Sequence, residues 1–212
     1  MKKMFSGLIL IGLILSLGVI LCGNANADSL TLLFQEGSNS QTFTGTDSIS
    51  TGSFTVGDFS VSYANVVTTP TLPGQVFADL GSFDATTATG GTLTITLTDA
   101  GLSLPQPPLA AIVTVDNTGV VHGTVGETSL VSITPPLSSL PLLTGVNVSE
   151  SALESFTNPF TLTDVITLTM DPYSHISFDN EMSASIPEPS TLLLLGAGMT
   201  GLGLLCGRRK KA

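Results

Sequence analysis

Gly91-Thr92-Leu93-Thr94-Ile95-Thr96-Leu97-Thr98 is the stretch of this 212-residue chain that decides its fold. Threonine alternates with a large aliphatic residue through the segment. A period of two residues places the aliphatic side chains on one face of a β-strand and the hydroxyls on the other. The stretch therefore predicts a strand with one buried face and one threonine-rich face in contact with solvent.

The same period recurs, less regularly, on both sides of this stretch. Residues 59–63, 161–170 and 176–186 each alternate apolar and polar side chains, which favours strands in all three places. The apolar positions are Phe59, Val61, Tyr63, Ile166, Leu168, Met170, Ile176, Phe178, Met182, Ala184 and Ile186.

Clusters of proline and glycine separate the alternating segments, at residues 70–74, 105–108 and 135–141. Short strands between frequent turn signals predict a mainly β fold, a single antiparallel β-sandwich of about eight to ten strands, with jelly-roll and immunoglobulin-like topologies both open. Residues 116–119, Asp-Asn-Thr-Gly, are expected to form a hairpin turn in which Gly119 adopts a positive φ. Residues 149–156 are the one weak candidate for a helix.

The N-terminal 27 residues have the features of a secretory signal peptide. Lys2 and Lys3 precede an apolar run at residues 4–21, and Ala25 and Ala27 provide a small-residue cleavage site. We therefore expect export by the Sec machinery and cleavage by signal peptidase after Ala27. A lipid anchor on Cys22 is the alternative, but Leu21 stands where lipoprotein processing requires a small residue.

The C-terminal segment has three parts in order: a Pro-Glu-Pro motif at 187–189, an uncharged apolar run at 191–207 and a basic cluster at 208–211. As a helix the apolar run would extend about 25 Å, at the short end of what crosses a bilayer. Its basic flank favours the cytoplasmic side. A permanent C-terminal anchor is one interpretation. The motif and stop residues are Pro187, Glu188, Pro189, Arg208, Arg209, Lys210 and Lys211.

This order of motif, span and basic cluster resembles the PEP-CTERM sorting signal of Gram-negative bacteria, with Ile186 in place of the commoner valine. The resemblance implies recognition by exosortase, an integral-membrane cysteine transpeptidase, transient contact with the inner membrane and removal of the tail. The cell surface or the medium would then be the destination. The body is also similar, less specifically, to uncharacterised β-rich PEP-CTERM proteins, a similarity that assigns no activity. It rests on residues 77–80, 91–99, 159–163 and 177–179.

Residues 28–186 are expected to form one secreted domain. All six Lys and Arg residues lie in the terminal segments, so the body carries 15 Asp and Glu residues and a formal charge of −15. Such a body will not bind nucleic acid, and it contacts anionic polysaccharide only through a bridging divalent ion. Cys22 and Cys206 also lie in the terminal segments, so the body has no thiol and no disulfide.

Candidate catalytic residues are few. His122 and His175 are the only imidazoles, too few for a metal site built on a Cys or His cluster, and any Ser-His-Asp arrangement would need one of them. The Gly-x-Ser-x-Gly motif is absent. For His175, a polar loop that enters a strand is a sufficient explanation. We therefore expect no enzymatic activity, no catalytic residue and no cofactor.

Carboxylates alone leave two kinds of site open. A glycosidase needs only a pair of them, but the chain has no Trp and two Tyr residues for a sugar cleft. A calcium site needs clustered oxygen ligands, and Asp171, Asp179 and Glu181 are the candidates, with Asp116 beside Asn117 as a second choice. No EF-hand spacing is present, and turn or surface roles explain these residues equally well.

The sequence thus favours an exported, exosortase-sorted, non-enzymatic structural component of the extracellular matrix, biofilm or envelope, with exopolysaccharide as a candidate partner. A calcium-dependent adhesin or carbohydrate-binding module is the alternative. A carboxylate-dependent glycoside hydrolase and an ice-binding protein rank below it, the latter because the Thr-x-Thr row at residues 92–98 resembles ice-adhesion surfaces.

Overall fold

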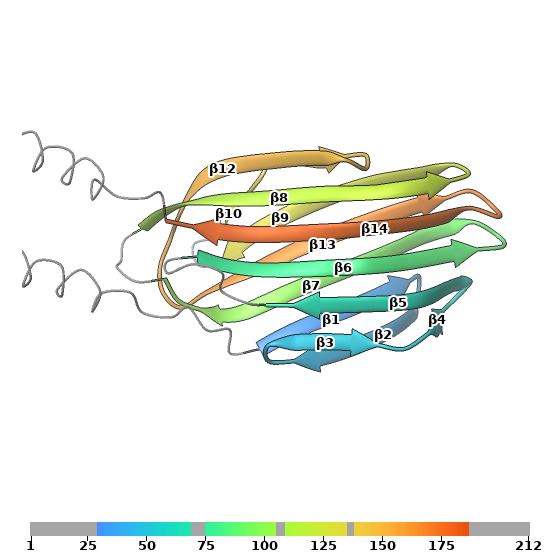
Figure 1. Cartoon of the computed structure of the whole chain (residues 1–212), viewed down its shortest axis with the longest axis horizontal. Helices are drawn as coiled ribbons and strands as arrows, with labels where there is room; N and C mark the ends of the chain where they lie inside the picture. The colour runs from blue at the N-terminus through green and yellow to red at the C-terminus, as the bar shows by residue number, and fades with distance from the viewer. Residues whose placement is uncertain (1–28, 69–74, 105–108, 135–137, 187–212) are drawn as a thin grey trace, which may run out of the picture.

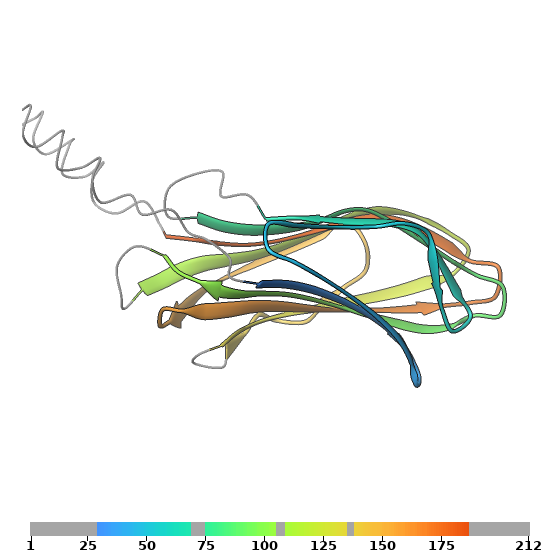
Figure 2. The same ribbon diagram turned by 90° about the horizontal axis from the view of Figure 1, so that it is seen from below.

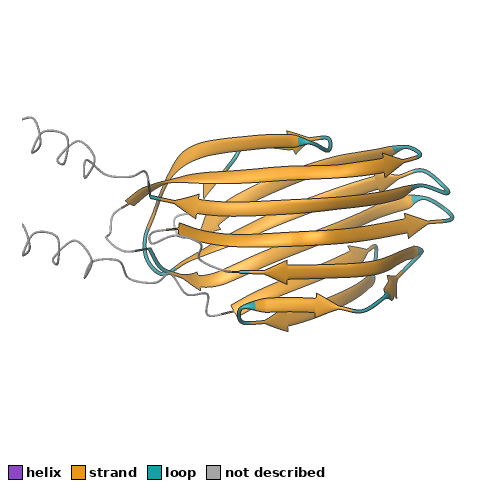
Figure 3. Ribbon diagram, viewed as in Figure 1, coloured by secondary structure: helices purple, strands orange, loops and turns teal. Residues whose placement is uncertain are grey.

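The computed structural model describes residues 29–68, 75–104, 109–134 and 138–186, and this part of the chain contains strands and no helix. Accordingly, it includes no helix that could cross a membrane. The expected signal peptide and the C-terminal apolar run lie outside the described residues (Figure 3).

Fourteen strands are formed in the described ranges, of which ten have seven or more residues and four have two to four. The ten longer strands account for the eight to ten expected from the sequence. Their bounds are β1 (Ser29–Glu36), β2 (Asn39–Gly45), β3 (Ser48–Thr51), β4 (Phe54–Val56), β5 (Phe59–Val67), β6 (Gln75–Thr87), β7 (Gly91–Leu102), β8 (Leu109–His122), β9 (Val125–Thr134), β10 (Ser138–Ser139), β11 (Leu143–Thr144), β12 (Val148–Phe156), β13 (Phe160–Met170) and β14 (His175–Ser185).

The strands form two seven-stranded antiparallel sheets. Sheet A has the order β10-β9-β13-β7-β1-β2, with β11 paired to β9, and sheet B has the order β12-β8-β14-β6-β5-β3, with β4 paired to β5. Figures 1 and 2 show them as two layers. Successive strands from β6 to β9, and again from β12 to β14, alternate between the sheets. The expected mainly β, antiparallel architecture is confirmed, and the two layers are consistent with a sandwich.

The hydrophobic core lies between the sheets and is centred on the alternating segment in β7. Leu93, Ile95 and Leu97 are fully buried, whereas the threonines between them point to the outer face of sheet A. Phe34 of β1 and Phe83 of β6 meet across the core, with ring centroids 5.8 Å apart and nearly parallel planes. Packing of apolar faces therefore holds the layers together, as the period of two predicts.

The prediction of a hairpin at residues 116–119 is wrong. These residues lie inside β8, which runs unbroken to His122 and pairs with β14 along this length. Gly119 has no positive φ. It is opposite Phe178, and a β-carbon at this position would lie 2.6 Å from the Phe178 β-carbon. The glycine therefore permits close approach of β14 and does not make a turn.

The weak helix considered at residues 149–156 is also wrong, because this segment is strand β12 at the edge of sheet B. Its side chains alternate between half-buried and exposed from Val148 to Ser155, and it pairs residue by residue with β8. Pairing with a long neighbouring strand outweighs a weak local preference for helix. Asn147, the residue before β12, continues the contact with β8: its side-chain oxygen accepts a hydrogen bond from the Gly119 N–H, and its amide nitrogen donates one to the Gly119 carbonyl.

The alternation at residues 59–63 ends at a β-bulge. Phe59 and Val61 are buried, but the register of β5 against β6 shifts between Val61 and Tyr63. Tyr63 is consequently exposed on the outer face, and Ala64 and Val66 take the inward positions. A bulge inserts one residue and so reverses the faces that follow it.

Candidate functional site

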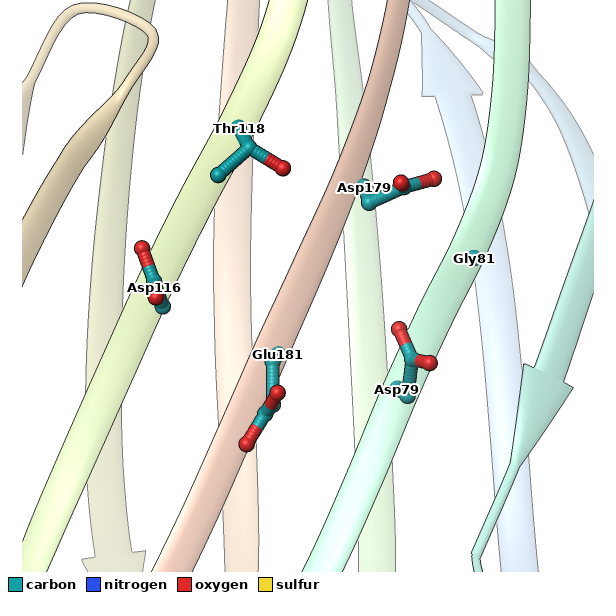
Figure 4. A pocket seen from close by; sticks show the side chains of 6 residues that line it. All are labelled: Asp79, Gly81, Asp116, Thr118, Asp179 and Glu181. Carbon is teal, nitrogen blue, oxygen red and sulfur yellow. The ribbon is translucent and has the colours of Figure 1, made fainter.

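Four carboxylates gather on the outer face of sheet B, on its three central long strands. Glu181 of β14 is opposite Asp79 of β6 on one side and Asp116 of β8 on the other, so three acidic residues form one row across the sheet. Asp179 lies two residues before Glu181, also facing outward. Figure 4 shows the group, which we call the acidic face: Asp79, Asp116, Asp179 and Glu181.

The acidic face surrounds a pocket of about 410 Å³. A bulge in β6, which has two residues between Leu80 and Phe83 opposite the single residue Asp179 of β14, shifts the register of the two strands at this place. Asn180 itself points inward and is fully buried, so the two acidic residues that flank it point outward. The pocket is lined by Asp79, Gly81, Asp116, Thr118, Asp179 and Glu181, a set without an aromatic side chain.

The acidic face carries negative charge that no nearby Lys or Arg of the described residues neutralises. Burial raises the pKa of Asp79, and the nearby Asp179 raises it further. The pKa of Glu181 is likewise raised by burial, then by Asp79 and Asp116. The described residues include no Lys or Arg that could offset this charge. The face therefore attracts cations and repels anionic polymers.

Of the three residues predicted as calcium ligands, the structure brings two together. Asp179 and Glu181 both line the pocket, whereas Asp171 lies in the exposed turn before β14, where its backbone N–H donates to the Thr124 carbonyl at 3.0 Å. Asp79 was not identified from the sequence, because it lies on another strand than Asp179 and Glu181 and meets Glu181 only through strand register. Over the described ranges, no group of three or more His, Cys, Asp or Glu side chains could hold a metal ion.

A second group of polar side chains lies inside the core, and sequence reasoning did not identify it. Asp164 of β13 accepts hydrogen bonds from the Ser129 hydroxyl and the Asn180 amide, each at 2.7 Å. The Asn180 amide also donates to the Asn117 side-chain oxygen at 2.6 Å. We call the buried polar cluster these residues and two further acids: Asp99, Asn117, Glu127, Ser129, Asp164 and Asn180.

Asp99 and Glu127 are the least compensated members of the buried polar cluster. They are 1% and 2% exposed, and neither carboxyl has a hydrogen-bond partner among the described residues. Burial raises the pKa of Asp99 to about 7, and burial with the charge of Asp164 raises the pKa of Glu127 to about 7. Burial raises the pKa of Asp164 as well, against the opposing effect of its hydrogen bonds. Burial thus extends the protonated form of Asp99 and Glu127 up to about pH 7.

A signal for these acids exists in the sequence. Asp99 follows Leu97 at the next inward position of β7, and Asp164 lies between Leu162 and Ile166 on the inward face of β13. An acidic residue in phase with aliphatic neighbours is therefore a candidate for burial. Their position in the alternation, where the neighbouring inward positions of the pattern carry aliphatic residues, identifies these acids as buried.

The two histidines do not form a catalytic triad in the described structure. The Ser174 hydroxyl beside His175 donates to the Thr124 carbonyl at 3.1 Å. His175 Nε2 lies 3.6 Å from Asp84 Oδ1, and both side chains are more than one-third exposed. A serine bonded to backbone is not activated by an imidazole, so these residues lack the arrangement for acyl transfer.

The end of β14 leads into the segment that comparison with known proteins identifies. A family model described as the PEP-CTERM protein-sorting motif matches residues 185–210. The chain carries a PEP-CTERM sorting motif. The PEP-CTERM match begins at Ser185, the last residue of β14, and includes Pro187, Glu188 and Pro189. It indicates an exported protein that exosortase recognises and that is sorted toward the cell surface.

The PEP-CTERM match covers the tail and not the body. No curated protein matches the chain. The similarity of the body to other β-rich PEP-CTERM proteins therefore stays a prediction, as do the cleavage after Ala27 and the stop formed by residues 208–211.

Proposed function

We propose that the body is a non-enzymatic structural component of the extracellular matrix, biofilm or envelope. The observation that carries the proposal is the position of the PEP-CTERM motif, which starts where the last strand of the body ends. Sorting through this motif delivers a folded, two-layered body to the outside of the inner membrane. The acidic face then meets the polymers of the cell surface.

The negative charge of the body supports this role and makes it dependent on divalent ions. The described residues carry no Lys or Arg, and the acidic face concentrates four carboxylates around one pocket. An anionic exopolysaccharide is repelled by such a surface unless divalent ions lie between them. Association with the matrix is therefore expected to depend on calcium or magnesium and to be reversed by a chelator.

The processing route belongs to the same proposal. In this route the Sec machinery exports the protein and signal peptidase removes residues 1–27. The apolar run then holds the protein transiently in the inner membrane, and exosortase removes the tail at the motif. The intact mass of the native secreted protein tests both cleavages. Replacement of Pro187, Glu188 and Pro189 by alanine should leave the tail in place and the protein in the inner membrane. A cytosolic product that keeps both ends would overturn the proposal.

A calcium-dependent adhesin or carbohydrate-binding module is the second candidate, favoured by the convergence of Asp179 and Glu181 on one pocket. The absence of a three-ligand group from the described ranges means that the carboxylates would have to move together around the ion. Calcium should then raise the melting temperature and permit binding to a glycan array. Asp79→Asn with Glu181→Gln should abolish both effects. The structural role, in which divalent ions only bridge two anionic surfaces, predicts no rise in melting temperature and no selectivity for one glycan.

The outer face of sheet A favours a third candidate, adhesion to ice. Thr98 of β7 lies between Thr31 of β1 and Thr163 of β13, so threonines continue across strands as well as along them. Hydroxyls then repeat about every 4.8 Å across the sheet and about 6.7 Å along it. Thermal hysteresis that Thr98→Lys abolishes would support this candidate, and its absence in the wild type would exclude it.

A carboxylate-dependent glycoside hydrolase is the fourth candidate. Glu181 with a raised pKa beside Asp79 and Asp116 provides the required pair of carboxyls. The pocket lining has no aromatic platform for a sugar ring. Turnover of a glycoside that Glu181→Gln abolishes would replace the non-enzymatic proposal.

A further inference from the structure

The only two histidines of the chain lie directly opposite each other in sheet B. His122 is the last residue of β8 and His175 is the first residue of β14, and the two are register partners. Their rings are stacked, with centroids 5.7 Å apart and planes 14° from parallel. Two imidazoles that are distant in sequence thus share one site at the start of β14, at the other end of this strand from Ser185 (Figure 1).

A carboxylate accompanies the pair. Asp84 of β6 places Oδ1 3.6 Å from His175 Nε2. In metal sites, a ligating histidine commonly donates its second ring N–H to a carboxylate, which fixes the tautomer and leaves the other nitrogen for the ion. At 3.6 Å the Asp84 carboxylate is just beyond hydrogen-bond distance of His175 Nε2, so the same arrangement requires a small approach of the two groups and then leaves Nδ1 for the ion.

We propose that His122 and His175 form an open binding site for a divalent transition-metal ion, with Asp84 as a positioning residue. Imidazole suits copper and zinc, and for such a site Cu²⁺ binds more tightly than Zn²⁺. The proposed ion differs from calcium, which takes oxygen ligands, and the proposal does not depend on the proposed function.

The spacing of the rings fits one ion. A metal–nitrogen distance of about 2.0–2.1 Å in a tetrahedral site places two imidazole centroids about 5 Å apart. The 5.7 Å separation of His122 and His175 is close to that value, but stacked rings hold their nitrogen lone pairs in nearly parallel planes, so binding requires at least one ring to turn until the lone pairs converge. The χ2 angle of histidine is broad, so turning one ring from the stacked position costs little.

The surroundings favour cations and leave coordination positions open. His122 is exposed and His175 is half-buried, so the ion meets solvent. Asp179 lies four residues along the same face of β14, and the described residues contain no Lys or Arg to repel an ion. Because no three-ligand group exists in the described ranges, water supplies the remaining ligands. An ion held in this way is exchangeable and can accept a donor atom from another molecule.

Calorimetric titration of the full-length protein in detergent with Cu²⁺ and with Zn²⁺ tests the proposal. We expect one ion per chain, tighter binding of Cu²⁺, and at least a tenfold loss of affinity for His122→Ala and for His175→Ala. Asp84→Asn should weaken binding about tenfold, the effect of losing a carboxylate that orients a ligating imidazole. Asp47→Asn, an exposed turn substitution outside the site, is the matched control and should leave affinity unchanged.

Three further measurements accompany the titration. Cu²⁺ should broaden the ring resonances of both histidines in proton NMR spectra, and circular dichroism should show the variants folded. Affinity should fall on acidification, since protons compete for imidazole nitrogen. Binding that persists in the His122→Ala/His175→Ala double variant would overturn the proposal. So would binding that disappears in Glu181→Gln and not in the histidine variants, because the ion would then lie on the acidic face.

Discussion

Asn180 of β14 donates a 2.7 Å hydrogen bond to the Asp164 carboxylate of β13, so that one buried contact joins sheet B to sheet A. Both residues are fully buried. Ser129 holds the other oxygen of Asp164, and Asn117 accepts a second bond from the Asn180 amide. Inside an apolar core, directional bonds of this kind favour one alignment of the two sheets over others.

Asn180→Ala should lower the free energy of unfolding by about 1–3 kcal/mol, since it leaves a buried acceptor of Asp164 without a donor. Urea denaturation followed by circular dichroism measures the change. Asn39→Ala, at an exposed position of β2, is the matched control and should change stability by less than about 0.5 kcal/mol. Equal effects of the two substitutions would show that the inter-sheet bond contributes nothing.

Stability should fall as pH rises from about 4 to 7. The folded-state pKa values of Asp99 and Glu127 are raised to about 7 from 3.8 and 4.5, so the folded state binds more protons than the unfolded state in this window. A difference of one between the folded-state and unfolded-state pKa values corresponds to about 1.4 kcal/mol, which gives a penalty on the order of 3–4 kcal/mol per carboxyl above pH 7. Urea denaturation at a series of pH values measures the slope.

Neutral replacements separate this effect from other titrations. Asp99→Asn and Glu127→Gln cannot ionise, so each should flatten the pH dependence and make the protein more stable than the wild type at pH 8. At pH 4 each should have little effect, because the native carboxyl is then protonated in the folded state. A wild-type stability that increases between pH 4 and 7 would contradict the assigned burial of these two acids.

Glu181→Gln should stabilise the protein at neutral pH. Glu181 lies opposite Asp79 and Asp116, and like charges in directly opposite positions cost about 0.2–1 kcal/mol. The pKa values of Asp79 and Glu181 are both raised, so the repulsion weakens as acidification protonates them. Thermal unfolding in low and high salt measures the gain, which salt should reduce. Asp47→Asn, at an exposed turn, should gain less, and an equal gain would mean that only net charge matters.

The alternating apolar pattern made the architecture predictable, because each strand buries one face. Residues 92–98 behave as their period requires, with the aliphatic side chains buried and the threonines outward. The acidic face was only partly predictable, since Asp79, Asp116 and Glu181 come from three strands and meet only through register. Nothing local to any one strand specifies which residues of another strand will lie beside it.

The histidine pair illustrates the same limit. Each imidazole taken alone is explained by a polar strand end, and only the pairing of β8 with β14 places His122 against His175. The buried polar cluster was missed for a different reason. Its acids were counted as surface charge, although Asp99 and Asp164 occupy the inward phase of strongly alternating strands. That phase is visible in the amino-acid sequence, so the burial of these two acids was predictable from it.

Gly119 provides the last test, because its role in the structure differs from the turn that its sequence predicts. Gly119→Ala should destabilise the protein by about 1–3 kcal/mol, since the added β-carbon would lie 2.6 Å from the Phe178 β-carbon and 2.7 Å from the Ser177 carbonyl oxygen. Gly52→Ala is the matched control, with no atom within 4 Å of the new β-carbon. Urea denaturation compares the two variants. A turn glycine with positive φ would tolerate Asn far better than Ala, whereas the close approach of β14 excludes both. Rescue by Gly119→Asn would therefore restore the hairpin interpretation and contradict a continuous β8.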